Sequence, residues 1–585
     1  MTEAGTKKDI ELKWNGWGFR DSYFYIGKDS LVHFAGEGGR YDISGHVLPR
    51  LNGFLEELEV DLKYTMPSQS FEDIAATIAP PIHNEGFQAV LAQLNILHSF
   101  DKKHRLARAH GHCLEEVYAL RHGTFARVPD IVIWPKTHDE VVHIVQAAHA
   151  NNVAIIPIGG GTSVTLALRC PENESRMIVS LDTSKMNRIV WLDKENLTAR
   201  VEAGCVGMDL ENELNKHGFT LGHEPDSVEF STVGGWVATR ASGMKRGKYG
   251  NIEDMLIHVT MVTPRGVLEK SCQGPRVSAG PDINQFIMGS EGTLGVITEA
   301  TFRISEKPPC KRYGSVVFPS FENGVKCIRE ITKQKCGAAS MRLIDNHHFR
   351  TGRCFKKGHL TIWKRLWEKI EDLYITAWKG FDSNEVCAMT LVFEGTEQEI
   401  KVQEKRIYDI ATSYKGFSGG PENGRYGYVL TYTIAYLRDI GMEYGFVGES
   451  LETSVPWDKI LPLRKNVAEY FKRESDKLGV PYIASFRVTQ AYDAGACVYM
   501  YYIFNYRKVQ HPVETYDKIE GTARDIVLAS GGSISHHHGV GKLRRKWLPA
   551  TVGDTGLTAM RSVKQALDPN NVFASGNLFE AAAKL

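Results

Sequence analysis

PIGGGTS, at Pro157–Ser163, contains three consecutive glycines that directly follow the apolar run 153–158. Glycine has no Cβ, so such a segment can turn sharply and direct several backbone N–H groups at one anion, as a pyrophosphate requires. Thr162 and Ser163 add hydroxyl donors without adding charge. The segment is neither a P-loop, because no lysine follows, nor the G-x-G-x-x-G turn of a Rossmann unit. On these residues alone, a plain tight turn and a pyrophosphate cradle both stay open.

Two further regions of small residues follow along the chain. DSVEFSTVGG (Asp226–Gly235) is followed closely by TRASG (Thr239–Gly243), and GSEGTLGVI (Gly289–Ile297) leads into an apolar run. Segments of this kind, in this order and with these gaps, are together a far more specific signal for pyrophosphate binding than any one of them. They therefore favour a pyrophosphate cradle over a plain tight turn at Pro157–Ser163.

An alternation of strands and helices begins near residue 128. The run 131–134 is predicted as a buried strand that stops at Pro135, and THDE (Thr137–Glu140) matches a capping box at the start of a helix. Further strands are predicted over 153–158, 177–181, 189–192, 198–202 and 256–262.

Four parts are expected along the chain. Residues 1–125 form an N-terminal region, irregular to about residue 80 and helical over 86–121, where the basic run 102–105 is interpreted as a solvated face. Residues 126–308, ending at KPP (Lys307–Pro309), form the first α/β domain, and 309–530 form a second one. Residues 531–585 form a C-terminal segment with a helix near 558–567.

Composition excludes several classes of function. The chain has 585 residues, and its 70 Lys+Arg against 69 Asp+Glu provide no basic field to attract nucleic acid. Its ten cysteines contain no C-x-x-C pair, which argues against a zinc site and a disulfide scaffold and for a reducing compartment. The first residues have no apolar core of a secretory signal, and no apolar run is long enough to span a bilayer.

The last three residues, Ala583-Lys584-Leu585, are similar to the S-K-L peroxisomal address, with alanine replacing serine. This ending predicts a peroxisomal location and recognition by the peroxisomal import receptor.

The glycine-rich segments resemble the FAD-binding domain of the vanillyl-alcohol-oxidase flavoprotein family over about residues 128–308. The resemblance implies an α+β fold: a two-subdomain FAD-binding domain, an α/β cap (substrate) domain and a helical N-terminal region. Some members tether the flavin through a histidine in the glycine turn; Thr162 fills that stretch here, so non-covalent FAD is expected. The matching motifs assign FAD binding to Pro157, Ile158, Gly159, Gly160, Gly161, Thr162, Ser163, Asp226, Ser227, Val228, Glu229, Phe230, Ser231, Thr232, Thr239, Arg240, Ala241, Ser242, Glu291, Gly292, Thr293, Leu294, Gly295, Val296 and Ile297.

The D-2-hydroxyacid dehydrogenase branch of this family is the alternative reading. That branch carries a motif like GHxGDGNLH, whose histidines bind a divalent metal, and a later GEHGxG that adds a carboxylate. The corresponding stretch here, Thr489–Tyr499, contains no histidine, and His537 stands where the glutamate would be. Both metal-binding elements are therefore missing, and no metal is expected.

The chain, which lacks these metal-binding elements, instead resembles the alkyldihydroxyacetonephosphate synthase family over nearly its whole length from about residue 90. The likeness is carried by SMRLIDN (Ser340–Asn346), TYTIAYLRDIGMEYG (Thr431–Gly445), ETSVPW (Glu452–Trp457), AYDAGACVY (Ala491–Tyr499) and SISHHHGVGK (Ser533–Lys542). It implies exchange of the acyl chain of acyl-dihydroxyacetone phosphate for a long-chain fatty alcohol, without net redox change. The flavin would be nucleophile and electron sink, and the product would be the precursor of ether lipids, plasmalogens included. A homodimer is expected by analogy, and a flavin-binding carrier or sensor is the non-enzymatic alternative.

The resemblance also assigns roles to the remaining site residues. Tyr499 is the expected acid/base; its ordinary pKa of about 10 would need lowering by nearby cations, and His536, His537 and His538 are the expected neighbours. Arg342 is assigned to catalysis and Arg438 to substrate binding, because guanidinium groups fit phosphate and carboxylate. Without the resemblance, Tyr499 reads as core packing and Arg342 as a structural ion pair.

One other segment concerns lipid supply. Residues 361–378 place aromatic and aliphatic side chains on one helical stripe with lysine and arginine off it. Such a helix either packs on a domain core or lies in a bilayer interface, so peripheral contact with the peroxisomal membrane is an open expectation.

Overall fold

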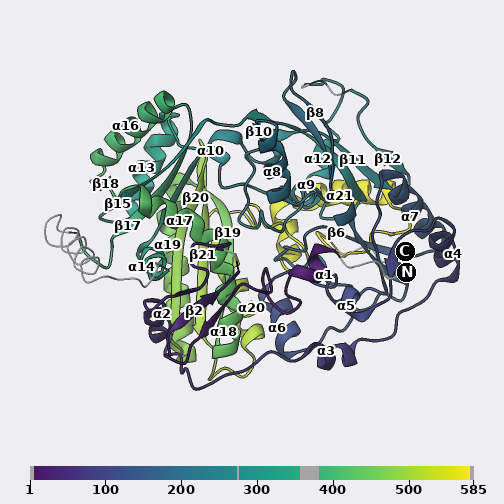
Figure 1. The fold of residues 1–585 in the computed structure, drawn as a ribbon, viewed down its shortest axis with the longest axis horizontal. Coiled ribbons are helices and arrows are strands. Elements are labelled where there is room, and N and C mark those ends of the chain that lie inside the picture. Colours follow the sequence, from purple (N-terminus) through teal and green to yellow (C-terminus); the bar gives the residue numbers. More distant parts are fainter. Residues whose placement is uncertain (1–5, 38, 273, 275, 356–380, 580–585) are drawn as a thin grey trace.

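The computed structural model describes residues 6–37, 39–272, 274, 276–355 and 381–579. Figure 1 shows two halves side by side. The first half, in blue and teal, carries a four-stranded and a five-stranded sheet, and the second half, mainly green, is built on one seven-stranded sheet.

The glycine turn (Pro157–Ser163) follows an edge strand of the four-stranded sheet, whose order is β4-β5-β7-β6. These strands span His98–Ser99, Ile131–Ile133, Ile178–Asp182 and Ala154–Ile158. Helix α7 (His138–Ala150) contributes buried residues to the same core. Thr137 accepts from the Glu140 N–H, but the Glu140 carboxylate accepts from Lys136 N–H, so only half of the predicted capping box forms.

The five-stranded sheet is antiparallel, in the order β12-β11-β13-β9-β8. Its strands span Gly266–Leu268, Leu256–Thr263, Val296–Arg303, Thr198–Glu202 and Ile189–Asp193. Short elements complete this half: α8 (Gly207–Lys216), α9 (Val233–Thr239), α10 (Arg246–Tyr249), α11 (Ile252–Met255), α12 (Asn284–Ile287), and the pair β10 (Phe219–Thr220) with β14 (Ser305–Glu306). The strands predicted in this half all form, each within one residue of the expected ends.

The seven-stranded sheet has the order β18-β15-β17-β16-β20-β21-β19. Its strands span Phe417–Ser418, Cys310–Phe318, Cys387–Gly395, Ser340–Ile344, Tyr482–Ala491, Gly495–Asn505 and Phe446–Pro456. One face packs in the largest core, together with α13 (Phe321–Lys333), α16 (Glu397–Ser413), α19 (Ile460–Leu478) and α20 (Pro512–Ala529). Other α-helices in the described part of this half are α14 (Asn346–Cys354), α17 (Pro421–Thr433) and α18 (Leu437–Tyr444).

Alternation along β21 divides its side chains between the two faces. Val498, Met500 and Tyr502 belong to the core, whereas Tyr499 and Tyr501 line a cavity on the opposite face. Because successive side chains of a strand point to opposite faces of the sheet, β21 presents one set of side chains to the cavity and the alternate set to the core.

The N-terminal region corrects the prediction of an irregular start. Residues 6–80 form α1 (Lys7–Glu11), a sheet of β1 (Tyr23–Ile26), β2 (Val32–Ala35) and β3 (His46–Val47), then α2 (Leu51–Glu57) and α3 (Phe71–Thr77). Phe24 and Phe34 share a core with Phe446 and Ile483 of the second half. Strands this short give little periodicity, and tertiary packing stabilises them.

The predicted helical stretch 86–121 is broken into α4 (Glu85–Gln93), α5 (Lys102–Leu106) and α6 (Leu114–His122). Its basic run is not wholly solvated, because Arg105 is buried and donates to the carbonyl oxygens of Pro129 and Ala79 at 2.7 and 3.0 Å. These two acceptors explain why the guanidinium can leave water.

The C-terminal helix α21 (Leu548–Leu567), yellow in Figure 1, begins ten residues before the predicted helix and contains a kink at Gly553 (φ 72°). The amphipathic segment 361–378 and the tripeptide 583–585 lie outside the described residues. Within the described chain, none of the helices combines the length and apolar character needed to cross a bilayer.

Candidate active site

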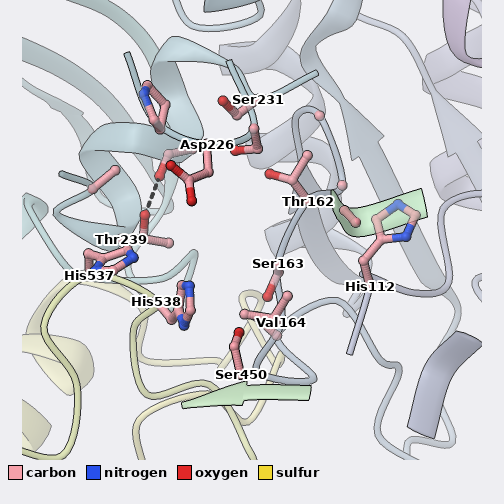
Figure 2. Close-up of a pocket in the computed structure, with 18 of the residues that line it drawn as sticks. His112, Thr162, Ser163, Val164, Asp226, Ser231, Thr239, Ser450, His537 and His538 are labelled. Carbon is pink, nitrogen blue, oxygen red and sulfur yellow. Dashed lines mark hydrogen bonds between the residues drawn. The ribbon is translucent and has the colours of Figure 1, made fainter. Parts of the chain in front are cut away.

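A cavity of about 430 Å³ is lined by residues of both halves of the molecule. Figure 2 shows its wall: Asp226, Ser231 and Thr239 lie opposite Thr162 and Ser163, with Ser450, His537 and His538 nearby. The polypeptide therefore brings the glycine turn, the cap sheet (the seven-stranded sheet) and the histidine loop (His536–Gly541) to one space.

The glycine turn fits a group that must approach the backbone closely. A Cβ at Gly160 would overlap the Phe230 carbonyl, and one at Gly159 would overlap the Thr232 hydroxyl. Within the described chain, the hydroxyls of Thr232 and Ser290 are buried without a hydrogen-bond partner. Both residues line the cavity, so unpaired donors and a Cβ-free surface suit the pyrophosphate and ribose of FAD.

Most of the residues predicted to bind FAD lie in the cavity wall, and Ser290, which was not predicted, lies there too. Glu229 and Phe230 instead line a neighbouring cavity of about 710 Å³. Arg240 ends α9 in the left-handed conformation (φ 51°) and pairs with Glu253 at 4.0 Å. The predicted residues outside the wall are Val228, Glu229, Phe230, Arg240, Thr293 and Leu294.

Tyr499, the predicted acid/base, lies in the wall of the cavity. On β21 it pairs with Glu452 of β19 and with Arg487 of β20. Its hydroxyl lies 2.9 Å from Ser450 Oγ and 3.3 Å from His538 Nε2. These two partners allow the phenol to pass its proton to the imidazole while the serine hydroxyl donates to the phenol oxygen.

Arg487 is the cation beside Tyr499, and sequence reasoning missed it. Its guanidinium carbon lies 4.2 Å from the Tyr499 ring centroid, and its Nη2 donates to Asp226 at 3.2 Å. Burial raises the pKa of Tyr499 well above its usual value, with Tyr501 adding to the rise and Arg487 opposing it. Regular hairpin pairing from Ala491 and Ala496 would place Val488 opposite Tyr499, but a register shift between Val488 and Gln490 places Arg487 there, so the sequence pattern does not reveal this arginine.

The three histidines are not the cations that the sequence reading expected. Burial lowers the pKa of His536 to about 3, and burial likewise lowers the pKa values of His537 and His538. All three imidazoles are therefore neutral near pH 7, where they can accept protons but supply no positive charge to Tyr499.

Glu452 organises the histidine loop and is a second residue that sequence reasoning did not assign, although the matched ETSVPW segment contains it. Fully buried, it accepts from the backbone N–H groups of His536 and His538 and from the Ser535 hydroxyl at 2.7 Å. Burial would raise the pKa of Glu452, but attraction to the histidines in their protonated form, His538 foremost, and to Arg544 holds it well below its usual range, so the carboxylate is ionised at the pH where the imidazoles are neutral. His538 Nδ1 lies 3.4 Å from this carboxylate, which favours the proton on Nδ1 and leaves Nε2 free to accept from Tyr499.

A chain of hydrogen bonds sets the tautomers of the other two histidines. Gln490 Nε2 donates to the Gly243 carbonyl at 3.0 Å, so its Oε1 is the acceptor for the Tyr492 hydroxyl at 2.8 Å. Tyr492 has no second proton, so His536 Nε2, 2.6 Å away, must donate to it. His536 Nδ1 then carries a lone pair and accepts from His537 Nδ1 at 2.9 Å. In this arrangement His537 keeps a lone pair on Nε2, and its imidazole lines the cavity.

Glu291 ties the histidine loop to the first half. Its carboxylate accepts from the backbone N–H groups of Val540 and Gly541 at 2.7 and 2.6 Å. Burial raises the pKa of Glu291 to about 7. The segment predicted to hold the flavin is thus joined directly to the loop that carries the imidazoles.

The two predicted arginines lie in the same cavity wall but have different partners. Arg342 donates to the Thr431 hydroxyl at 2.7 Å and lies 3.6 Å from Asp226, which it shares with Arg487. Arg438 donates to the His112 carbonyl and lies 3.6 Å from Glu449. Two guanidinium groups around one carboxylate leave a net positive charge beside Tyr499.

The family comparisons define the class of protein first. Residues 129–271 match the family described as FAD binding domain, and residues 307–578 match the family described as FAD linked oxidases, C-terminal domain. A solved p-cresol methylhydroxylase superposes with a TM-score of 0.64 at 16% identity, over 86% of this chain and 97% of that one, which shows a common fold. The chain is an FAD-binding flavoprotein with the predicted vanillyl-alcohol-oxidase architecture.

Closer relatives narrow the class. The alkyldihydroxyacetonephosphate synthase of Caenorhabditis elegans is 51% identical over 576 residues, which cover 98% of this chain and 96% of that protein. The Dictyostelium discoideum enzyme of the same name is 31% identical over 96% of this chain and 92% of its own. A solved alkyldihydroxyacetonephosphate synthase superposes with a TM-score of 0.84 at 29% identity, covering 96% and 98% of the two chains. This chain belongs to the alkyldihydroxyacetonephosphate synthase family.

Proposed function

We propose that the protein exchanges the acyl chain of acyl-dihydroxyacetone phosphate for a long-chain fatty alcohol and so forms the ether bond of ether lipids. The observation that carries the proposal is the Tyr499–His538–Glu452 series: the phenol lies 3.3 Å from one nitrogen of a neutral imidazole, whose other nitrogen lies 3.4 Å from a buried carboxylate. The curated relatives of the same family support it.

The series gives Tyr499 a way to act as acid and base despite its raised pKa. When the phenol loses its proton to His538 Nε2, the imidazolium that forms lies against the ionised Glu452, and Arg487 faces the phenolate. The buried carboxylate thus compensates for the charge on the imidazole, as in other nucleophile–base–carboxylate arrangements. Tyr499 can take a proton from the substrate carbon and return one without a solvated ion.

The remaining polar groups have separate roles. His537, with its Nε2 lone pair, can accept the proton of the incoming alcohol, and Arg342 and Arg438 supply positive charge for the phosphate and the departing carboxylate. Bound FAD, held by the glycine turn and the segments around 226–242 and 290–297, supplies a nucleophile and electron sink, so the exchange needs no second redox partner.

An apolar part of the cavity suits the alkyl chains. Trp17 and Phe54 from the N-terminal region, with Leu437, Phe446 and Ile503 from the second half, line this end. Burying a chain against such residues contributes about 0.8 kcal/mol per methylene group. A long-chain alcohol therefore binds with its hydroxyl toward the polar end.

Further parts of the proposal rest on the sequence. The flavin is non-covalent, since Thr162 occupies the glycine turn where a tethering histidine would stand. The C-terminal Ala-Lys-Leu directs the protein to the peroxisome through the import receptor, and membrane contact and a homodimer complete the proposal.

The decisive experiment incubates the purified flavoprotein with an acyl-dihydroxyacetone phosphate and labelled hexadecanol, without any electron acceptor. Labelled ether product and an equal amount of released fatty acid are expected. Ether formation that requires an acceptor, or oxidation of a D-2-hydroxyacid in its place, would contradict the proposal and favour the dehydrogenase alternative.

A further inference from the structure

We propose that Cys497, His536 and His537 form a binding site for a soft divalent metal ion such as Zn²⁺, and that the bound ion inhibits the enzyme. The Cys497 sulfur and one nitrogen of each imidazole lie within 4.8 Å of one another. Sulfur and imidazole nitrogen are the donors that Zn²⁺ prefers, and the fourth position would be taken by a water or a substrate oxygen. Of the three, His537 stands at the position of the glutamate ligand in the dehydrogenase motif quoted above, whereas Cys497 and His536 stand at positions that are not metal ligands in that motif.

The two imidazoles already point at one another. His536 Nδ1 and His537 Nδ1 are 2.9 Å apart, and the hydrogen bonds through Gln490 and Tyr492 require His536 to carry its only proton on Nε2. The His536 Nδ1 lone pair is therefore prepared for an ion, and its other nitrogen has the hydrogen-bonded partner that metal-bound histidines commonly have.

Cys497 provides the third donor from a rigid position. It lies on β21 and is fully buried, paired in register with Ser454 on one side and Gln490 on the other. On binding, the thiol releases its proton to solvent and forms a metal–thiolate bond, and His537 releases the proton that now bridges the two Nδ1 atoms. No oxidant or reductant takes part.

Inhibition follows from the tautomer of His537. Without the ion, its proton is on Nδ1 and Nε2 can accept a proton from the alcohol. With the ion on Nδ1, a neutral imidazole must carry its proton on Nε2, which becomes a donor. The same ring in the cavity wall would then lack the base. This inhibitory consequence rests on the proposed reaction, whereas binding of the ion does not.

The test uses the holoenzyme and compares wild type with Cys497→Ser and with Cys272→Ser, which removes an exposed thiol elsewhere. We expect Zn²⁺ to inhibit the wild type and EDTA to restore activity. Cys497→Ser should retain turnover and require at least about 10- to 100-fold more Zn²⁺ for the same inhibition, since changes around metal ligands have effects of this size. Cys272→Ser should behave as the wild type.

Cobalt(II) supplies a readout independent of turnover. Wild type should bind one Co²⁺ and show tetrahedral d–d bands at wavelengths beyond the flavin absorption, and Cys497→Ser should lose them. Equal zinc sensitivity of wild type and Cys497→Ser, or loss of sensitivity in Cys272→Ser, would overturn the proposal. If Cys497→Ser fails to fold, the wild-type spectrum decides: no tetrahedral cobalt signal means no such site.

Discussion

Replacing Arg487 by methionine removes the guanidinium whose central carbon lies 4.2 Å from the Tyr499 ring centroid. For two unit charges at that separation and an effective dielectric constant of about 20, the lost attraction is about 4 kcal/mol, or roughly three units of pKa. If the phenolate is fully formed in the rate-limiting transition state, the variant should turn over up to about 10³-fold more slowly than the wild type. Arg487→Lys, which keeps the charge but not the planar contact, should recover part of the loss.

The assay is turnover of acyl-dihydroxyacetone phosphate with labelled alcohol as a function of pH, with flavin content measured for each variant. Arg487→Met should lower turnover and shift the alkaline limb of the profile upward, because the pKa of Tyr499 rises further. Arg105→Met is the matched control, since Arg105 is equally buried but bonds only to carbonyl oxygens away from the cavity. An Arg487→Met enzyme with full flavin, near-normal turnover and an unchanged pH profile would refute the role given to this arginine.

The other predictions concern the proton relay, the cofactor and pH. Tyr499→Phe should keep its flavin and lose about 10²–10⁴ in rate, whereas Tyr502→Phe, whose hydroxyl bonds Ser475 away from the cavity, should lose little. Combining Tyr499→Phe with His537→Ala or His538→Ala should lower the rate by much less than the product of the two single losses, because residues that act as one unit are non-additive. A loss equal to that product would mean that the histidines act in a separate step. EDTA should cause no loss of activity in the holoenzyme as purified, because the dehydrogenase metal ligands are missing, and a loss restored by zinc or manganese would point to the dehydrogenase chemistry. Acid precipitation should release the flavin, and flavin retained on the chain would disprove the non-covalent assignment. Because the pKa of Glu291 rises from 4.5 unfolded to about 7 folded, its contribution favours the folded state below pH 4.5 and is lost as pH rises toward 7. Relative to wild type, Glu291→Gln should therefore gain on the order of 3 kcal/mol between those pH values in chemical denaturation, and a pH-independent difference would contradict it.

The glycine-rich segments could be read from the sequence because their signal is local. A backbone that must approach a pyrophosphate excludes Cβ atoms, and the overlaps that a side chain at Gly159 or Gly160 would make express the same constraint in three dimensions. The longer strands of the first half were largely predictable too, whereas its short strands β4, β10, β12 and β14 were not predicted, because so few residues give no periodicity. The roles proposed for Tyr499 and the histidines come from the family resemblance and stay predictions.

The electrostatics of the site could not be read in this way. The charge of an imidazole depends on its pKa, which burial lowers. Three adjacent histidines in the sequence do not indicate whether His536, His537 and His538 are buried. Arg487 escaped attention because its effect depends on strand pairing across β20 and β21, and the N-terminal sheet escaped because contacts with residues more than 400 positions away stabilise it. These are tertiary effects, which override local propensity.

The histidine loop also indicates how one fold can support different chemistries. Glu452 from the second half and Glu291 from the first hold the loop mainly through backbone N–H groups, at positions 536, 538, 540 and 541. Those contacts do not depend on which side chain stands at position 537. Because the two carboxylates fix the path of the loop through its backbone, the side chain at position 537 can change, and with it the chemistry of the loop, without loss of the fold.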